Sequence, residues 1–397
     1  MIRAYQAPTL ALLLLFAASI DQRAAAEAVE LKTMSFNIRA DFNFGAASSD
    51  ANAWISTSGS HRRDLASAVI NDYEPDILGV QEAFNNQVDD LKSALPNYSF
   101  YGVGREDGAT LGEYSGIFYR SDRFTQTEQG TFWLSLTPDT PSFYPGTTFR
   151  IASWVILEDN QAGDQEYFIL NSHWAQGFPG TEAREYSAGL VRDRVKLLAG
   201  NRPLMVMGDL NAFDFQPAYL NLLGQDDPNG FQLVDSYRTI FPVQGPNERT
   251  NHGFIGHIDG QRIDYMLHSN DFHANAAEIV HTSYSGSYPS DHYPITTNLT
   301  LVPEGDFNFD GEVDGTDLLI WQRGESPDPL SSSDLADWVT NYGPTTPLSA
   351  TTVVVPEPSS WAIMLTTTMI PFSRIVVVAQ RALDAAENWD YHDQGRR

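Results

Sequence analysis

Short apolar segments alternate with amphipathic segments between Leu31 and Leu301. Segments rich in β-branched and aromatic residues and bounded by turn residues are typical of strands, and they cover residues 31–38, 76–83, 115–120, 150–157, 166–174, 203–211, 262–269 and 293–301. Helical spacing of apolar residues predicts helices at 60–73, 86–95 and 181–200. Many strands with few helices indicate an α+β fold in which two packed sheets are flanked by helices.

The pattern changes after Pro303 and divides the chain into four parts. We predict a signal peptide at 1–26, a main domain at 27–302, an acidic appendage at 303–345, and a linker with an apolar tail at 346–397. The first part has a basic start, a short apolar core and an Ala-rich cleavage site. A short membrane anchor is the alternative there, but the apolar run is short for a span.

Composition favours a folded protein and limits its chemistry. The 397 residues include 42% hydrophobic residues and no cysteine, which excludes disulfides, thiolate metal sites and thiol nucleophiles. The net charge is −27, and residues 27–302 alone hold 17 Lys and Arg against 35 Asp and Glu. Because nucleic-acid binding favours a basic face, this acidity disfavours long nucleic acids as partners unless metal ions offset the repulsion.

Polar residues stand at or near the ends of several predicted strands. They are Asn37, Glu82, Asn171, His173, Asp209, Asn211, Asp264, Asp291 and His292. Each one alone is explained as a turn cap, but strand ends of packed sheets converge, and clefts form there. Oxygen ligands and imidazole without cysteine suit Mg²⁺ or Mn²⁺. No G-x-S-x-G elbow or phosphate-binding G-x-x-x-x-G-K-[ST] loop is present.

Seven motifs in order carry a resemblance to a known family: "MSFNIR", "ILGVQEA", "GEYSGIFYR", "LNSHW", "MGDLNA", "RIDYML" and "PSDHYP". Together they resemble the endonuclease/exonuclease/phosphatase superfamily of nucleases, phosphatases and sphingomyelinases, over about 31–301. The resemblance implies a four-layer α/β sandwich. It also implies hydrolysis of a phosphate ester by one in-line displacement by water, helped by a divalent metal ion.

The resemblance implies a role for each matched residue. Asn37, Glu82 and Asp291 belong to the metal site, and His292 is the general base that Asp264 orients. Asp209 and Asn211 position water and phosphate, while His173 donates to phosphoryl oxygens with Glu113 as its carboxylate partner. Phosphate binding is expected for Asn171 and Arg184, although an Arg on a helix is often only solvated. One departure is Ala175, which stands where the family has an acid.

The appendage contains the sequence "DFNFDGEVDGTD", which resembles a dockerin-type calcium loop. Ligand positions fall on Asp306, Asn308, Asp310, Glu312 (through its carbonyl), Asp314 and Asp317. The expected architecture therefore includes a small helical calcium-loop appendage, and a protein partner could bind it. An acidic linker is the alternative. The tail segment "VPEPSSWAIMLTTTMIPFSR" resembles a PEP-CTERM sorting signal, which implies exosortase-type sorting machinery as a partner.

The sequence thus predicts an exported or cell-envelope hydrolase of phosphoric esters with Mg²⁺ or Mn²⁺ at its active site and Ca²⁺ in the appendage. A phosphodiesterase or nuclease is favoured, because two acid-paired histidines are commonly used in that way. Alternatives are a phosphomonoesterase, a sphingomyelinase-like lipid phosphodiesterase, and, from another class, a calcium-binding interaction protein of the cell surface.

Overall fold

The structure is a computed structural model that describes residues 30–225 and 232–343. Its first sheet has the strand order β11-β12-β1-β2-β4-β3. Strands β1 and β2 are parallel, and the other pairs are antiparallel. The bounds are β1 Glu30–Asn37, β2 Ile77–Ala83, β3 Tyr98–Tyr101, β4 Tyr114–Arg120, β11 Phe272–Ile279 and β12 Ile295–Leu301.

The second sheet has the order β5-β6-β7-β8-β10-β9, with β7 and β8 parallel. Its strands are β5 Phe124–Trp133, β6 Ile151–Asp159, β7 Gln165–His173, β8 Leu204–Asp209, β9 Val234–Asp235 and β10 Asp264–His268. Apolar residues of both sheets, among them Ile117, Ile169, Met205, Met207 and Ile295, form one buried cluster between them. This layer between the sheets needs apolar residues on the inner face of every strand. The strands therefore appear in the sequence as short apolar segments.

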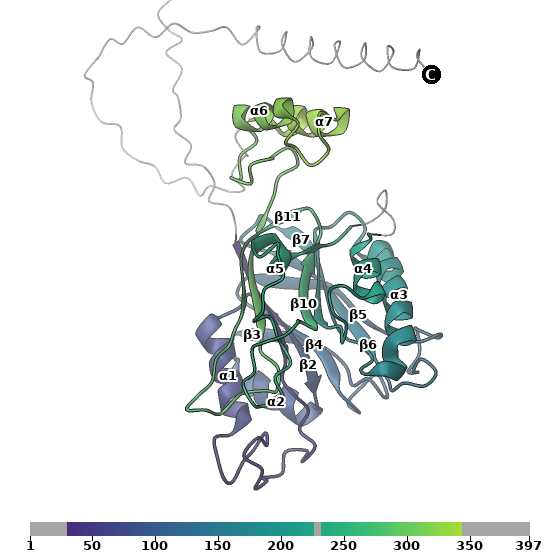
Figure 1. Cartoon of the computed structure of the whole chain (residues 1–397), viewed down its shortest axis with the longest axis vertical. Coiled ribbons are helices and arrows are strands. Elements are labelled where there is room, and N and C mark those ends of the chain that lie inside the picture. Colours follow the sequence, from purple (N-terminus) through teal and green to yellow (C-terminus); the bar gives the residue numbers. More distant parts are fainter. Residues whose placement is uncertain (1–29, 226–231, 344–397) are drawn as a thin grey trace, which may run out of the picture.

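Helices cover the outer faces of both sheets (Figure 1). α1 (Arg62–Tyr73) and α2 (Asn85–Ala94) pack on the first sheet through residues such as Ile70 and Leu91. α3 (Thr181–Ala199) and α4 (Pro217–Leu223) pack on the second, and η1 (Phe178–Gly180) and α5 (Ser236–Ile240) are shorter. The predicted arrangement of two mixed sheets flanked by helices is confirmed.

The sequence did not predict four strands and two helices, namely β3, β5, β9, β11, α4 and α5. β5 reads "FTQTEQGTFW" and is exposed along its middle, and β11 reads "FHANAAEI" with four small or polar residues in a row. Both lie at or next to a sheet edge, where few side chains need to be apolar. Their pairing comes from the neighbouring strands and not from their own periodicity.

A pair of short helices follows the sandwich. α6 (Gly315–Arg323) and α7 (Ser332–Asn341) enclose a small core of Val313, Trp321, Leu335 and Trp338. The ring of Phe309 stacks on His273 of β11 at 4.3 Å, so this unit touches the first sheet. The helical part of the appendage is seen, while calcium binding stays a prediction. The predicted signal peptide and sorting tail lie outside the described residues. Within residues 30–225 and 232–343, no helix is both long and apolar enough to cross a membrane.

Candidate active site

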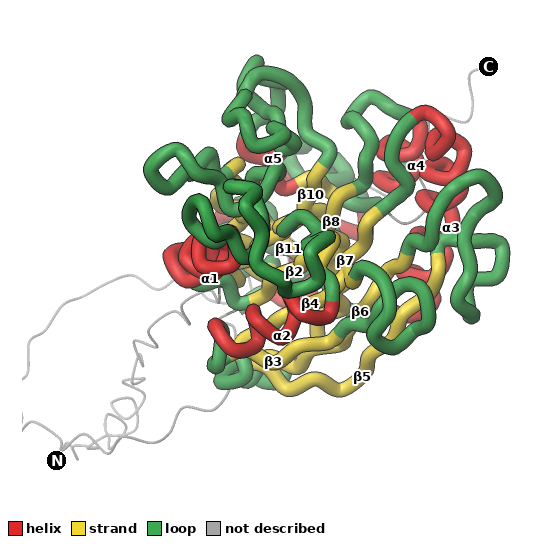
Figure 2. The backbone as a smooth tube through the Cα atoms, turned by 90° about the horizontal axis from the view of Figure 1, so that it is seen from below, coloured by secondary structure: helices red, strands yellow, loops and turns green. Residues whose placement is uncertain are grey.

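Three of the predicted site residues stand side by side on neighbouring strands. His173 at the end of β7 is opposite Asp209 of β8, and Asp209 is opposite Asp264 of β10. In the other sheet Asn37 of β1 is opposite Gln81 of β2. The Asn37 amide donates to Asp209 across the two sheets at 3.0 Å. Loops gather over this end of the sandwich, so the polar strand ends lie at the base of a loop-lined face (Figure 2).

Glu82 reaches the site through a bulge in β2. The β2–β4 register shifts between Gln81 and Ala83, and Glu82 has a φ of 62°, a strained value for a residue with a side chain. Its carboxylate accepts from the Asn37 amide and the Ala40 N–H, each at 3.1 Å. Burial alone would raise the pKa of Glu82, but His292, the Ala40 N–H and Arg39 outweigh burial and lower it. Glu82 is therefore an anion held ready for a cation.

His292 is the partner of Asp264, as predicted. Its Nδ1–H donates to Asp264 Oδ2 at 2.8 Å, and its Nε2 lies 2.7 Å from the Asn251 amide nitrogen. Burial would lower the pKa of His292, but the Asp264 carboxylate, with Asp209 and Asp291 nearby, raises it to about 10. The Asn251 amide as donor fits the neutral imidazole, in which Nε2 accepts a proton. A divalent cation among these carboxylates favours that neutral form.

His173 has a different partner from the predicted one. Its Nδ1 lies 2.9 Å from Arg150 Nη1, whereas Glu113 Oε2 is 3.8 Å away and is bound by Arg105. Because a guanidinium only donates, Nδ1 must accept, and the ring proton is on Nε2. Burial, Arg150 and Arg105 hold the pKa of His173 well below its ordinary value. The direct contact of His173 Nδ1 is thus Arg150, with Glu113 farther away, and the role of Glu113 as the carboxylate partner of His173 stays a prediction.

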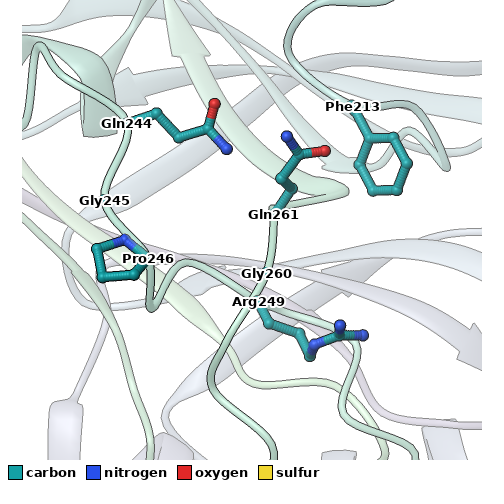
Figure 3. Close-up of a pocket in the computed structure, with 7 residues that line it drawn as sticks. All are labelled: Phe213, Gln244, Gly245, Pro246, Arg249, Gly260 and Gln261. Carbon is teal, nitrogen blue, oxygen red and sulfur yellow. The ribbon is translucent and has the colours of Figure 1, made fainter.

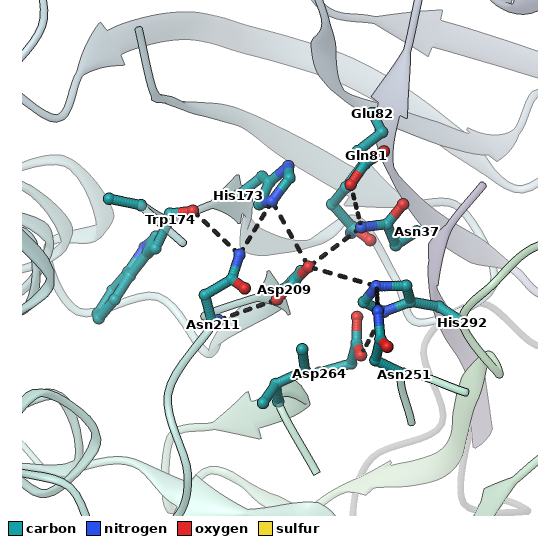
Figure 4. A network of polar contacts seen from close by, with 12 residues as sticks. Asn37, Gln81, Glu82, His173, Trp174, Asp209, Asn211, Asn251, Asp264 and His292 are labelled. Carbon is teal, nitrogen blue, oxygen red and sulfur yellow. Dashed lines mark hydrogen bonds and ion pairs between the residues drawn. The ribbon is translucent and has the colours of Figure 1, made fainter. Parts of the chain in front are cut away.

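Asp209 lies between the two histidines (Figure 4). Its Oδ2 is 3.5 Å from His173 Nε2 and 3.9 Å from His292 Nε2. Burial and the Asp264 charge raise the pKa of Asp209 to about 7. Asn211, with a φ of 49°, donates its N–H to Asp209 at 2.9 Å, and its amide lies 3.1 Å from His173 Nε2. The predicted pair Asp209 and Asn211 therefore faces the same small space as both histidines.

The carboxylates fit a divalent cation. In the part of the chain that the structure describes, ligand atoms of Glu82, His173 and Asp209 lie within 4.8 Å of one another, as do those of Asp209, Asp264 and His292. The buried Asp264 Oδ1 has no hydrogen-bond partner among the described residues. Such a concentration of buried negative charge needs a cation, and oxygen ligands with imidazole suit Mg²⁺ or Mn²⁺.

Two other predicted metal residues lie at the edge of this cluster. Arg39 reaches Glu82 at 3.4 Å and Asp291 at 3.6 Å, so a guanidinium stands between the two carboxylates. The Asn37 amide nitrogen, not its oxygen, points toward Glu82 and Asp209. The roles of Asn37 and Asp291 as metal ligands stay predictions.

Two predicted phosphate-binding residues make structural contacts instead. The Asn171 amide donates to the carbonyls of Val80 and Gly116 and accepts from Gln81, which ties the two sheets together. The Arg184 guanidinium donates to the carbonyls of Ala175 and Gly177 after β7. In these positions both groups hold the backbone of the site, and their roles in phosphate binding stay predictions.

Sequence reasoning missed four residues that contact the site: Arg39, Arg105, Arg150 and Asn251. Arg150 is the first residue of a predicted strand, and its place at a strand end, like that of several predicted site residues, was the available signal. Asn251 stands in a long polar loop, where nothing in its neighbourhood distinguishes it.

Comparison with known proteins supports the family resemblance of the sequence. The sequence profile described as "Endonuclease/Exonuclease/phosphatase family" matches residues 34–292. A crystal structure of an endonuclease/exonuclease/phosphatase from Bacteroides vulgatus is 32% identical, with a TM-score of 0.60 over 69% of this chain and 99% of that one. A mannosyl-6-phosphatase from Bacteroides thetaiotaomicron is 30% identical, with a TM-score of 0.59 over 68% of this chain and 100% of that one.

Two more distant matches are weaker, one a likeness of fold alone and the other a partial match in sequence. The human Nocturnin catalytic domain is 18% identical with a TM-score of 0.54 over 69% of this chain and 95% of that one, a likeness of fold alone. An uncharacterized mimivirus protein, R895, is 23% identical over 57% of this chain, and the match spans only 35% of its own length.

The chain belongs to the Endonuclease/Exonuclease/phosphatase family, because the family profile covers most of its length, from the first of the seven motifs to His292 in the last. The predicted enzyme class, a hydrolase acting on phosphoric ester bonds, is confirmed by this membership.

Proposed function

We propose that the protein is a divalent-metal-dependent hydrolase of small phosphate monoesters, in which His292 activates the attacking water. The observation that carries this proposal is the row His173–Asp209–Asp264 with His292 and Glu82 around it, all buried at one end of the sandwich. A bound Mg²⁺ or Mn²⁺ would polarise a phosphoryl oxygen and offset the charge of the leaving oxygen.

The side chains divide the remaining tasks. His292 takes a proton from water at Nε2 while Asp264 fixes its Nδ1–H and stabilises the imidazolium that forms. His173, neutral and protonated at Nε2, donates a hydrogen bond to a phosphoryl or leaving oxygen. The Asn211 amide lies 3.1 Å from the same nitrogen and donates to the carbonyl of Trp174. Fixed donors that face developing negative charge supply a large share of the catalysis in such sites.

Three observations favour small monoesters over the diesters expected from the sequence. The expectation of a diesterase depended on two acid-paired histidines, and only His292 has a carboxylate as its direct partner. The net charge of −27 opposes a long polyanion. A relative that is 30% identical over its full length is a mannosyl-6-phosphatase.

The test compares 4-nitrophenyl phosphate, mannose 6-phosphate, bis(4-nitrophenyl) phosphate and plasmid DNA as substrates of the purified protein with Mg²⁺, Mn²⁺ or EDTA. We expect turnover of the monoesters that EDTA abolishes and that His292→Ala lowers by about 10²–10⁴-fold. The matched control is His257→Ala, which removes an exposed histidine. Turnover of the diesters alone would contradict the monoester proposal, and unchanged turnover in His292→Ala would contradict the assigned base.

We also propose that the appendage binds Ca²⁺. Asp306 in the loop before α6 and Asp317 in the first turn of α6 are both buried, and Asp306 accepts the N–H of Phe309 and Gly311. A loop folded around two inward carboxylates supports this reading. Differential scanning fluorimetry should show stabilisation by Ca²⁺ that Asp306→Ala abolishes, and no Ca²⁺ effect on the parent protein would favour an acidic linker.

Export is part of the same proposal and depends on sequence alone. The segments 1–26 and 346–397 are proposed as secretory and sorting signals, with an exosortase as the sorting partner. Expression in a bacterial host followed by fractionation, with and without residues 1–26, tests the first of these. Equal retention of both forms in the cytoplasm would contradict it.

A further inference from the structure

A pocket of about 440 Å³ adjoins the site and takes no part in the chemistry described above. Side chains from three segments surround it, as Figure 3 shows: Phe213, Gln244, Pro246, Arg249 and Gln261, with backbone from Gly245 and Gly260. Its volume is within the range of pockets that bind metabolite-sized ligands.

Each wall of the pocket is close in sequence to a site residue. Phe213 is two residues beyond Asn211, Arg249 is two residues before Asn251, and Gln261 is three before Asp264. Consecutive Cα atoms are about 3.8 Å apart, so two residues span at most about 7.6 Å. A molecule whose phosphate lies between the two histidines therefore has its organic half within reach of this pocket.

Arg249 is a cation without an acidic partner among the described residues. Glu248, the acid next to Arg249 in sequence, is bound by Arg238 at 2.5 Å, and the carboxylate of Asp259 lies 3.7 Å from His257 Nδ1. Arg249 donates through Nε to the carbonyl of Asp259, and neither terminal amino group of its guanidinium has a hydrogen-bond or ion-pair partner among the described residues. In a domain this acidic, an unpaired guanidinium in a pocket indicates an anionic ligand.

The backbone next to Arg249 leaves room for its guanidinium, because residue 260 is a glycine. Gly260 has a φ of 131°, and a Cβ there would lie 2.9 Å from Arg249 Nη2 and 3.0 Å from its Nε. The Gly260 N–H is bound to the carbonyl of Pro246, which joins the two sides of the pocket. A side chain at position 260 would push the guanidinium away, so glycine keeps the cation in place.

Phe213 provides a flat apolar wall. Its ring stacks on Phe215 at 5.6 Å with an angle of 24° between planes, although both rings are partly exposed. The amides of Gln244 and Gln261 offer donors and acceptors nearby. A flat apolar surface with amides suits the face and the hydroxyl groups of a sugar ring.

We infer that this pocket binds the alcohol half of the ester and that this half is a sugar ring with a second anionic group, as in a sugar bisphosphate. This inference rests on the proposed function for the placement of the first phosphate. Arg249 pairs with the second anion, and Phe213 contacts the ring.

The test measures binding and needs no turnover. Calorimetry with Mg²⁺ in the His292→Ala background compares glucose 6-phosphate with glucose 1,6-bisphosphate, and inorganic phosphate serves as the reference ligand. We expect the bisphosphate to bind about tenfold more tightly or better, because a charge-assisted hydrogen bond contributes about that factor. Two equivalent phosphates alone give a factor of about two by statistics, so only a larger ratio supports the inference.

Substitutions in the pocket test whether the preference for the bisphosphate over the monophosphate comes from the pocket residues. Arg249→Gln should reduce the affinity ratio to about two, Arg249→Lys should retain part of it, and both should leave the affinity for inorganic phosphate unchanged. Phe213→Ala should weaken both sugar phosphates and preserve the ratio. Arg323→Gln, which removes the same charge from α6, is the control and should change nothing.

The inference would be overturned by an affinity ratio near two in the His292→Ala protein, or by a larger ratio that remains when Arg249→Gln is added. If the unmutated protein does not hydrolyse monoesters, that result would count against the proposed function. The ratio of the two binding affinities could still be measured.

Discussion

The two histidines of the site are equally buried, each 4% exposed, but they face opposite charges. His292 has the Asp264 carboxylate at 2.8 Å, and His173 has the Arg150 guanidinium at 2.9 Å. As a result the pKa of His292 is raised to about 10, whereas the pKa of His173 is lowered well below its ordinary value. The same side chain thus serves as a base on one side of Asp209 and as a neutral hydrogen-bond donor on the other.

This contrast shows that the partner of a buried histidine decides its chemistry. A carboxylate stabilises the imidazolium, so His292 can hold a proton taken from water. A guanidinium destabilises the imidazolium, so His173 stays neutral and keeps one N–H for the phosphate. Changing either partner should therefore change the role of the histidine more than its position.

The largest effect is expected on the His292 side. Asp264→Asn removes the charge that favours the imidazolium, and kcat should fall by about 10²–10⁴-fold. The measurement is steady-state turnover of 4-nitrophenyl phosphate with Mg²⁺. The control is Asp271→Asn, in the turn after β10, which should retain activity. A fall of less than about tenfold in Asp264→Asn would mean that His292 does not depend on its partner.

A smaller effect is expected from Arg150→Gln. Burial still lowers the pKa of His173 in this variant, but loss of the guanidinium should raise it from its value in the unmutated protein, so activity should fall most at acid pH. At pH 8 we expect a loss of about tenfold, the worth of one hydrogen bond from a charged group. The readout is a kcat–pH profile from pH 5 to 9, with Arg150→Lys as the conservative comparison. A profile parallel to that of the unmutated protein would show that Arg150 does not set the charge of His173.

Glu113→Gln should cost less than Arg150→Gln. Glu113 is 3.8 Å from both His173 Nδ1 and Arg150 Nη1 and is bound by Arg105, so Arg150 can still donate to His173 without it. We expect a loss of tenfold or less in kcat, with little change in the pH profile. A loss larger than that of Arg150→Gln would restore Glu113 as the direct partner, as the sequence suggests.

The smallest effect is expected on stability, with opposite signs for the two histidines. His292 has a raised pKa when folded, so its contribution is complete below about pH 6.5 and is lost as pH rises toward 10. His173 has a lowered pKa, so its contribution is complete above about pH 6.5 and is lost at lower pH. The Tm difference between the unmutated protein and His292→Gln should shrink from pH 6 to 10 in EDTA. The difference for His173→Gln should shrink from pH 7 to 5, and equal trends would contradict the contrast.

Much of the fold and the site could be predicted from the sequence, for physical reasons. Residues such as Asp209 and His173 interrupt apolar strands at their ends, and strand ends of packed sheets converge. The motif order then indicated the family. The partners of these residues could not be predicted, because pairing depends on the three-dimensional neighbours of each side chain. Arg150 precedes one strand and His173 ends the next, and only antiparallel pairing of β6 and β7 brings them together.

The same limit explains the predictions that placed Asn171 and Arg184 on phosphate. Asn171 is two residues before His173 and therefore lies on the same face of β7, toward the first sheet, but it is farther from the strand end and fully buried between the two sheets. Its amide therefore meets backbone carbonyls of the other sheet. Arg184 is on the first turns of α3, near enough to the loop after β7 to bind its carbonyls.

The most direct test of the contrast is a titration of both imidazole rings by ¹⁵N NMR in EDTA, assigned with His173→Asn and His292→Asn. The account predicts that His292 is still an imidazolium at pH 8, and that His173 is still neutral at pH 5.5 with its proton on Nε2. Two rings that titrate together near pH 6.5 would contradict it.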